Sequence, residues 1–127
     1  MVGIVLVSHS NKLVEGLKEL ISQMAPEIKI CTAGGTDDGR IGTDPIKIMN
    51  AIEESYSDEG VLLFFDIGSA IMNAELAIDM LDDSISSNVD ICKTSLVEGA
   101  FVAAIESSMG KSKEEIKESI RNLEIEK

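Results

Sequence analysis

The apolar residues of this chain gather in four short runs that are separated by amphipathic segments. Two runs, Val2 to Val7 and Val61 to Phe65, are continuously apolar, which is typical of parallel strands covered by helices on both faces. The other two, Ile28 to Ala33 and Val89 to Lys93, are β-branched but contain charged residues, which favours positions at the sheet edges. We therefore predict four parallel strands, with the first and the third in the centre.

The segments between these runs carry the periodicity of helices. Between residues 13 and 24 apolar residues recur at helical spacing, and Pro26 closes the segment,. The next helix is predicted to begin at Asp44-Pro45, because a carboxylate N-cap precedes a proline at the position that needs no N–H,. The predicted inner stripe of this second helix consists of Ile46, Met49 and Ile52.

The remaining helices are predicted from their caps. Ser69 is positioned to cap a helix that runs to about Leu81,. Two capping boxes, Ser95 with Glu98 and Ser112 with Glu115, predict the last two helices,.

The alternation of strands and helices along the chain predicts an α/β fold. We expect a three-layer α/β/α sandwich with a mainly parallel four-stranded sheet, in the order 2-1-3-4 by analogy with flavodoxin-like folds. No internal repeat or linker divides the sequence. Residues 1–127 are therefore expected to form a single domain.

The charge balance restricts the partners. The 127 residues include 44% apolar and 27% charged residues, an ordinary globular balance, and carry a formal net charge of −12,. Such a chain repels a nucleic-acid backbone and opposes the capture of free anionic metabolites, whereas it favours encounter with a protein that carries a basic patch. We expect no nucleic-acid partner, and we expect a protein rather than a free nucleotide as the partner of this chain.

Neither the cysteines nor the N-terminus indicates an extracellular or membrane protein. Cys31 and Cys92 lie far apart, each within a short apolar run, a pattern that fits neither a metal site nor a disulfide framework. The N-terminal segment has no basic region, and its apolar run is too short for a signal peptide or a membrane span,. The predicted location is the cytoplasm.

Three polar segments are predicted to meet at the carboxyl edge of the sheet. They are Ser8-His9-Ser10 after the first strand, residues 34–39 after the second, and residues 66–69 after the third. His9 is the only histidine of the chain, and an imidazole that is neutral at neutral pH is a nucleophile. Asp66 is placed to bind the far nitrogen of the ring, to fix its tautomer and to stabilise positive charge on it.

The surroundings of His9 are suited to a phosphate. Backbone N–H groups at a glycine turn or a helix start bind phosphate oxygens, and the segment Gly34-Gly35-Thr36 is predicted to supply such a cradle. The helices that begin after His9 and at Ser69 would direct two positive dipole ends at the same point. We therefore predict a phosphorylated imidazole at His9.

Simpler interpretations of the same residues remain open. A single histidine at a strand end is often structural, the glycine segment can be only a turn, and Asp66 and Ser69 can be caps. A divalent metal site could be formed by Asp37, Asp38 and Asp44. The spacing of these aspartates is not that of a calcium-binding loop, so we predict no metal site.

Two segments, residues 70–72 and residues 96–105, carry more apolar surface than one inner helix face requires,. A buried core explains this surplus most simply. A dimer interface is the alternative, with Met72 beside the site helping to receive a partner protein.

Three blocks of sequence resemble a known family. They are VGIVLVSHS with His9, AGGTDDGRIGTD from Ala33 to Asp44, and FFDIGSAIMNAE from Phe64 to Glu75. From Val2 to about Glu106 the chain is similar to the DhaM family, the phosphotransfer subunits of phosphoenolpyruvate-dependent dihydroxyacetone kinase. The wider group is the mannose-class IIA domains of the bacterial sugar phosphotransferase system. Those relatives usually carry His-Gly after the first strand and Gly-Gly-Ser-Pro after the third, so Ser8-His9-Ser10 and Gly68-Ser69-Ala70 favour DhaM.

The resemblance implies a relay of phosphate between proteins. The phosphocarrier HPr would phosphorylate His9, and the chain would then pass the phosphate to ADP held in the DhaL subunit, which acts with DhaK on dihydroxyacetone. ADP and magnesium would belong to DhaL, so this chain would need no cofactor, and relatives of this kind are homodimers. Asp66 would orient His9, while Gly35, Thr36 and Ser69 would hold phosphate oxygens.

Other functions remain to be distinguished. A mannose-class IIA protein would use the same histidine but pass phosphate to a IIB domain. A receiver domain would be phosphorylated on Asp66, although the acidic pair that receivers place after the first strand is replaced here by Ser8-His9-Ser10,. The aromatic content of 3% argues against a flavin-binding module, because flavin pockets generally use aromatic side chains. A non-catalytic adaptor is the remaining alternative.

Overall fold

The structure, a computed structural model, describes residues 1–127. Its sheet has four strands, all parallel, in the order β2-β1-β3-β4, which confirms the predicted topology. The strands are β1 (Gly3–Ser8), β2 (Ile30–Gly34), β3 (Val61–Phe65) and β4 (Val89–Cys92). The helices are α1 (Asn11–Met24), α2 (Pro45–Ser55), α3 (Ala70–Asp79), α4 (Asp83–Ser86), α5 (Leu96–Ser108) and α6 (Lys113–Ser119), followed by the 3-10 turn η1 (Arg121–Leu123).

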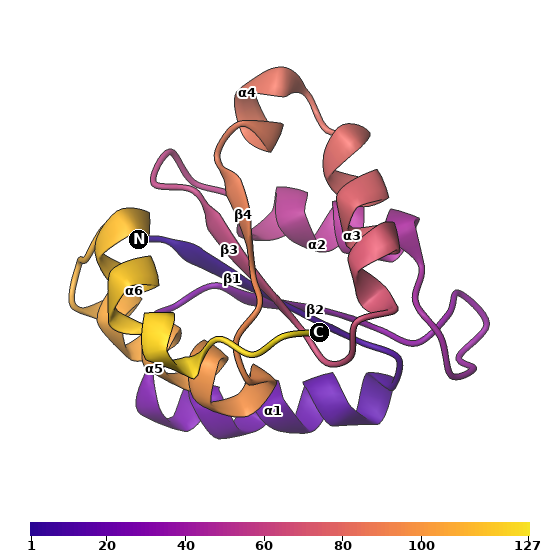
Figure 1. Ribbon diagram of the computed structural model, residues 1–127, viewed down its shortest axis with the longest axis horizontal. Coiled ribbons are helices and arrows are strands. Elements are labelled where there is room, and N and C mark those ends of the chain that lie inside the picture. The colour runs from indigo at the N-terminus through magenta and orange to yellow at the C-terminus, as the bar shows by residue number, and fades with distance from the viewer.

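The elements form three layers, as Figure 1 shows. Helices α2 and α3 cover one face of the sheet, and α1 and α5, with α6 beside them, cover the other. Alternate residues of the central strands enter the two cores, because successive side chains of a strand point to opposite faces. Thus Leu6 and Phe64 pack toward α1 and α5, whereas Val7 and Phe65 pack toward α2 and α3. The three-layer fold predicted from the sequence is confirmed.

The two central strands are buried throughout, as their continuous apolar runs predict. β1 pairs with β2 and β3 in parallel register, so that Ser8 lies opposite Gly34 and Val7 opposite Phe65. The segments that leave β1, β2 and β3 therefore emerge side by side at the carboxyl edge. This register places His9 between the two segments that begin at Gly35 and Asp66.

The start of α2 agrees with the prediction, and its predicted inner stripe agrees in part: Ile52 is buried and Met49 packs against the core. Asp44 accepts a hydrogen bond from the Ile46 N–H at 2.9 Å, and Pro45 follows at the first helical position. Ile46 was predicted to face the core and is 50% exposed. The buried residues of α2 are Ile48, Ala51, Ile52 and Ser55, a stripe at helical spacing. Ile46 lies two residues before Ile48 and therefore on the opposite side of the helix.

Of the two capping boxes predicted for the last two helices, the structure contains one. Ser112 and Glu115 form the predicted capping box before α6. Ser95 precedes α5 but makes no side-chain cap bond, so the capping box predicted there is wrong. The Ser95 backbone N–H instead donates to Leu123 O at 3.0 Å, because the end of η1 lies alongside it. The short elements α4 and η1 were not predicted, since neither carries a periodic apolar pattern.

The cysteines are buried and free, as expected. Burial raises the pKa of Cys31 to about 11 and that of Cys92 to about 12, so both thiols stay protonated near neutral pH. None of the helices is long and apolar enough to cross a bilayer.

Candidate functional site

The site is built around His9, the first residue after β1. Its imidazole is 21% exposed and lies between Asp66, which follows β3, and Ser69, which precedes α3. The Nδ1 atom is 3.0 Å from Asp66 Oδ1, and the Nε2 atom is 2.8 Å from Ser69 Oγ. Both nitrogens of the ring are therefore held by the turn after β3; a contact of Asp66 with the ring was expected from the sequence, and the contact of Ser69 with Nε2 was not.

Asp66 is fixed by donors from both neighbouring strands. Its carboxylate accepts from the His9 N–H at 3.0 Å, from the Ser8 hydroxyl at 2.9 Å and from the Ile67 N–H at 2.7 Å. Burial alone would raise the pKa of Asp66, but the hydrogen bonds outweigh it and hold that pKa below its ordinary value,. Asp66 is therefore ionised near neutral pH and accepts hydrogen bonds only.

An ionised Asp66 decides the tautomer of the ring. Because the carboxylate accepts but does not donate, the proton of a neutral His9 lies on Nδ1 and the lone pair lies on Nε2. The Ser69 hydroxyl then donates to that lone pair. The ring nitrogen that carries a lone pair is thus Nε2, on the side of the ring away from Asp66.

Ser69 differs from the helix cap that its sequence position also suggested. It precedes α3 in a helical conformation and makes no side-chain cap bond. Its hydroxyl is directed at His9 instead. Neither the Gly68 nor the Ser69 N–H donates to an acceptor within the chain, so two amide donors of this turn have no partner in the protein.

The loop after β2 lies on the other side of His9, but its donors are turned inward. The Gly35 N–H donates to Ser8 O at 3.0 Å, and the Thr36 N–H donates to Arg40 O at 2.9 Å. The Thr36 hydroxyl donates to Asp38 at 2.5 Å and accepts from the Arg40 N–H at 3.1 Å. The structure thus brings Gly35 and Thr36 near His9, while the donors predicted to bind phosphate are already paired.

Gly35 owes its position to its backbone. It has φ of 74°, in the left-handed region that residues with a side chain rarely adopt,. This turn returns the chain so that the Gly42 N–H reaches His9 O at 2.9 Å. The glycine segment therefore closes over the His9 backbone, which is the structural turn that the sequence left open as an alternative.

Several residues of the site could not be found from the sequence. Ser8 is fully buried and links Asp66 to the Ser10 N–H through its hydroxyl. Its only sequence signal is a polar residue at the end of a buried strand, directly before His9. Asn73 donates to Thr43 Oγ1 at 2.7 Å and so ties α3 to the loop before α2, a contact between segments that no local pattern reveals.

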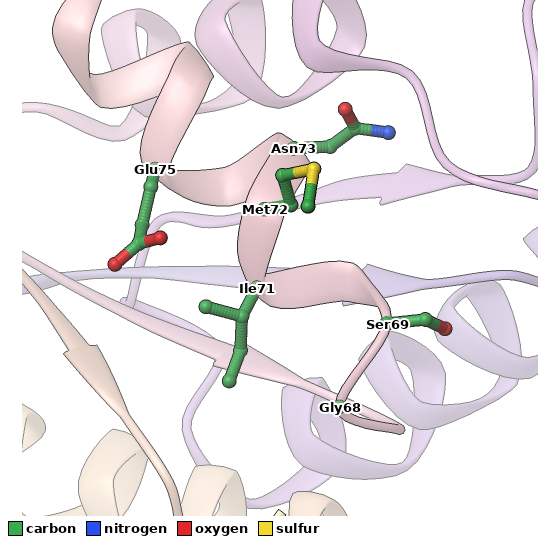
Figure 2. A pocket seen from close by; sticks show the side chains of 6 residues that line it. All are labelled: Gly68, Ser69, Ile71, Met72, Asn73 and Glu75. Carbon is green, nitrogen blue, oxygen red and sulfur yellow. The ribbon is translucent and has the colours of Figure 1, made fainter.

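A shallow pocket of about 480 Å³ adjoins the site along the start of α3. Figure 2 shows it with Met72 and Asn73 on the helix, and with the Ser69 side chain pointing away from Ile71 and Glu75. Met72 is 77% exposed, so the buried position that the apolar surplus favoured is wrong for this residue. The exposed thioether leaves an adaptable apolar surface beside His9.

The acidic residues near the site do not form a metal centre. Asp38 pairs with Arg40 at 2.9 Å, and Asp44 caps α2. No group of three or more metal-ligating side chains occurs in the structure. The geometry instead combines a nucleophilic nitrogen, an orienting carboxylate and free amide donors.

Comparison with known proteins assigns the family. The sequence pattern of the family described as PTS system fructose IIA component (EIIA-man) matches residues 3–117. The chain therefore belongs to this family of phosphotransferase-system domains.

Within this family, the similar proteins are DhaM subunits of dihydroxyacetone kinases. The chain is 44% identical over 124 residues to "PEP-dependent dihydroxyacetone kinase 2, phosphoryl donor subunit DhaM" of Listeria innocua, covering 97% of this chain and 99% of the relative. It is 42% identical over 125 residues to the phosphotransferase subunit DhaM of the PTS-dependent dihydroxyacetone kinase of Lactococcus lactis, covering 98% of each. It is 42% identical to DhaM of Klebsiella michiganensis, where it spans 27% of a longer protein.

A solved structure has the same fold. The crystal structure titled "unknown function protein EF1359" superimposes with a TM-score of 0.86 at 41% identity, covering 98% of this chain and 96% of that one. The resemblance predicted from the three sequence blocks is confirmed along the chain.

Proposed function

We propose that this chain is the phosphoryl donor subunit of a phosphoenolpyruvate-dependent dihydroxyacetone kinase. It accepts a phosphoryl group on His9 from phospho-HPr and passes it to ADP held in a DhaL subunit, which acts with DhaK. The observation that carries the proposal is the fixation of Nδ1 by ionised Asp66, which leaves Nε2 as a nucleophile beside free amide donors. The near full-length similarity to DhaM proteins supports the identity of the acceptor.

In the first step the Nε2 lone pair of His9 attacks the phosphorus of the donor's phosphohistidine. A new P–N bond forms, the P–N bond to the donor breaks, and the donor imidazole retains its electron pair. The Nδ1 proton stays on His9, where Asp66 stabilises the positive charge of the phosphorylated ring. Ser69 rotates its hydroxyl from Nε2 to a phosphate oxygen, beside the Gly68 and Ser69 N–H groups.

In the second step a terminal oxygen of ADP attacks the phosphorus. The P–N bond to His9 breaks, ATP forms in the acceptor subunit, and the neutral imidazole returns with its lone pair on Nε2. ADP and magnesium are held by DhaL in this proposal, so His9 is the only covalent carrier on this chain. Gly35 and Thr36 position the loop over His9, and a direct contact of their N–H groups with phosphate requires the loop to open.

Two further features belong to the proposal. We place the chain in the cytoplasm, where the donor HPr acts, and we expect it to form a homodimer. Exposed apolar residues along α3 support a surface through which two copies associate. They are Met72, Leu76 and Met80. Sedimentation equilibrium measures the molar mass in solution and so tests for the dimer.

Intact-mass spectrometry tests the relay. The chain is incubated with phosphoenolpyruvate, Enzyme I and HPr, and then with DhaL·ADP or with a mannose-class IIB domain. We expect a gain of one phosphoryl group, about 80 Da by the mass of HPO₃, that DhaL·ADP removes and the IIB domain does not. His9→Ala is the negative control, since no other side chain carries the bond. Phosphate that persists with DhaL·ADP but leaves to the IIB domain would instead make the chain a sugar-transport IIA protein.

A further inference from the structure

Each of the two loops that flank His9 rests on a lysine ammonium group. Lys47 of α2 donates through Nζ to Gly34 O at 2.9 Å and to Thr36 O at 3.2 Å. Lys127 donates through Nζ to Phe65 O at 2.8 Å and to Asp66 O at 3.1 Å. The two lysines therefore bind carbonyl groups at the ends of β2 and β3, on either side of the strand that carries His9.

Lys127 reaches the site because the segment before it is held along the end of β4. The Ile125 N–H donates to Lys93 O at 2.8 Å, and Glu124 bridges Thr94 in antiparallel fashion. In Figure 1 this segment, in yellow, extends from α6 to the turn that follows β3. The C-terminal segment and the turn after β3, which lie far apart in sequence, thus meet next to Asp66.

The contact between Lys127 and the turn after β3 is close. A Cβ atom placed on Gly68 would lie 3.0 Å from the Lys127 carbonyl carbon, so only glycine allows this approach without a shift. The Lys127 Nζ atom also lies 4.4 Å from the centre of the buried Phe65 ring, within the range of a cation–π contact,. Burial lowers the pKa of Lys127, while the nearby Asp66 opposes that shift.

The charges of these two lysines are not cancelled by an ion pair. Lys111, Lys113 and Lys117 each pair with a carboxylate, as do Arg40 and Arg121. Neither Lys47 nor Lys127 takes part in any ion pair. In a chain with a net charge of −12, they leave positive charge where a phosphoryl dianion must arrive.

We propose that Lys47 and Lys127 are positioning residues for phosphoryl transfer, an inference that rests on the proposed function. By binding carbonyl oxygens, each ammonium fixes the peptide planes of one loop, and Lys127 sets the orientation of Asp66 and of the free Gly68 and Ser69 N–H groups. Their charges also offset the acidic field at Nε2. Neither lysine contacts the reacting atoms, so both act through the loops and through the field.

Several other charged groups near His9 are paired or capped. Asp66, at the end of β3, is the charged group in contact with the ring. Asp38 and Arg40, in the loop over the His9 backbone, form an ion pair at 2.9 Å, and Asp44 caps α2. Asp37 and Lys12 form no ion pair, but their side chains donate or accept no hydrogen bond in either loop. Lys47 and Lys127 are therefore the unpaired charges that bind the backbone of the two loops.

The test compares Lys47→Met and Lys127→Met with Lys47→Arg and Lys127→Arg. Lys29→Met is the matched control, because Lys29 is exposed, takes part in no ion pair and directly precedes β2, at the edge of the sheet opposite His9. The rate of His9 phosphorylation is measured against donor concentration and pH. The tautomer of His9 is measured separately by ¹⁵N NMR in the absence of donor.

We expect each Met variant to lower the transfer rate constant about tenfold, with KM changed less than about threefold, because the loops lose alignment rather than donor affinity. The acid limb of the pH–rate profile should move upward by about half a pH unit, since loss of a nearby positive charge favours protonation of the ring. The Arg variants should restore both, and Lys29→Met should match the wild type.

Lower melting temperatures with an unchanged rate constant and pH profile would overturn the proposal, because they would assign the lysines to stability alone. Failure of the wild type to accept phosphate would overturn the proposed function instead. In that case the NMR measurement still tests the lysines, since Lys127→Met should change the Nδ1–H to Nε2–H ratio of His9. An unchanged ratio would remove Lys127 from the site.

Discussion

The two loops beside His9 divide the tasks of the site in a way that their sequences do not suggest. The loop after β2 has the glycines of a phosphate cradle, yet the Gly35 and Thr36 N–H groups are paired within the protein. The turn after β3 looks like an ordinary helix start, yet Asp66 and Ser69 hold both ring nitrogens of His9. Glycine content therefore indicates where a backbone turns, whereas the direction of each N–H decides what it can bind.

This difference predicts that substitutions in the turn after β3 alter transfer, and that substitutions within the loop after β2 mainly alter stability. Lys47 of α2 is the exception, because its charge also acts on transfer through the field at Nε2. Asp66→Asn should have the largest effect on transfer. The amide presents its NH₂ group to Nδ1, which moves the ring proton to Nε2 and removes the nucleophilic lone pair. We expect a transfer rate roughly 100-fold lower, measured by rapid quench with phospho-HPr. A rate within twofold of the wild type would contradict the role of Asp66.

Ser69→Ala and Thr36→Val compare one hydroxyl from each loop. Ser69→Ala removes the group that contacts Nε2, and we expect the transfer rate to fall about tenfold. Thr36→Val removes a hydroxyl that binds only within its own loop, so the rate should stay within about threefold while stability falls by about 1 kcal/mol. A larger fall in the transfer rate for Thr36→Val than for Ser69→Ala would instead indicate that the loop after β2 contacts the phosphate.

Gly35→Ala should act on stability. The left-handed φ of 74° and a Cβ position 3.0 Å from Arg40 O both oppose a side chain here. We expect a loss of about 1 to 2 kcal/mol in urea unfolding. Gly39→Ala is the matched control, because it shares a positive φ but has open space around its Cβ position, so the difference between the two isolates the contact. Equal losses would show that φ alone sets the cost.

The pH dependence of stability should show a smaller effect of the turn after β3. The pKa of Asp66 is held below its ordinary value, so its contribution is present above the unfolded pKa of about 3.9 and is lost as pH falls through the folded pKa. The stability difference between wild type and Asp66→Asn should therefore shrink below about pH 4. Chemical unfolding at a series of pH values measures this difference. A difference that is independent of pH would contradict the ionised state of Asp66.

The fold was predictable because its signals are local. Continuous apolar runs such as Val2 to Val7 mark buried parallel strands, and Asp44-Pro45 marks a helix start. The four strands, their order and the position of His9 at the carboxyl edge all agree with the sequence prediction. The face of α2 was predicted less well, because the buried stripe follows Ile48, Ala51 and Ile52, which places the apolar Ile46 on the opposite, exposed side of the helix.

The site was predictable only in part. His9, Asp66 and Ser69 come together as expected because the parallel register fixes which strand ends are neighbours. The internal pairing of the Gly35 and Thr36 donors depends on how the loop closes, and no residue pattern reports it. Lys127 comes from a segment that crosses the end of β4, so its contact with Asp66 O is set by tertiary packing.

The nitrogen of His9 that carries the phosphate gives the most direct test of the central claim. The chain, labelled with ¹⁵N at histidine, is phosphorylated by phospho-HPr and examined by ¹⁵N and ³¹P NMR under alkaline conditions that preserve phosphohistidine. Because Asp66 holds Nδ1, we predict phosphorus coupling to Nε2 and a proton on Nδ1. Phosphate on Nδ1, or a phosphoprotein with unmodified His9, would contradict the account.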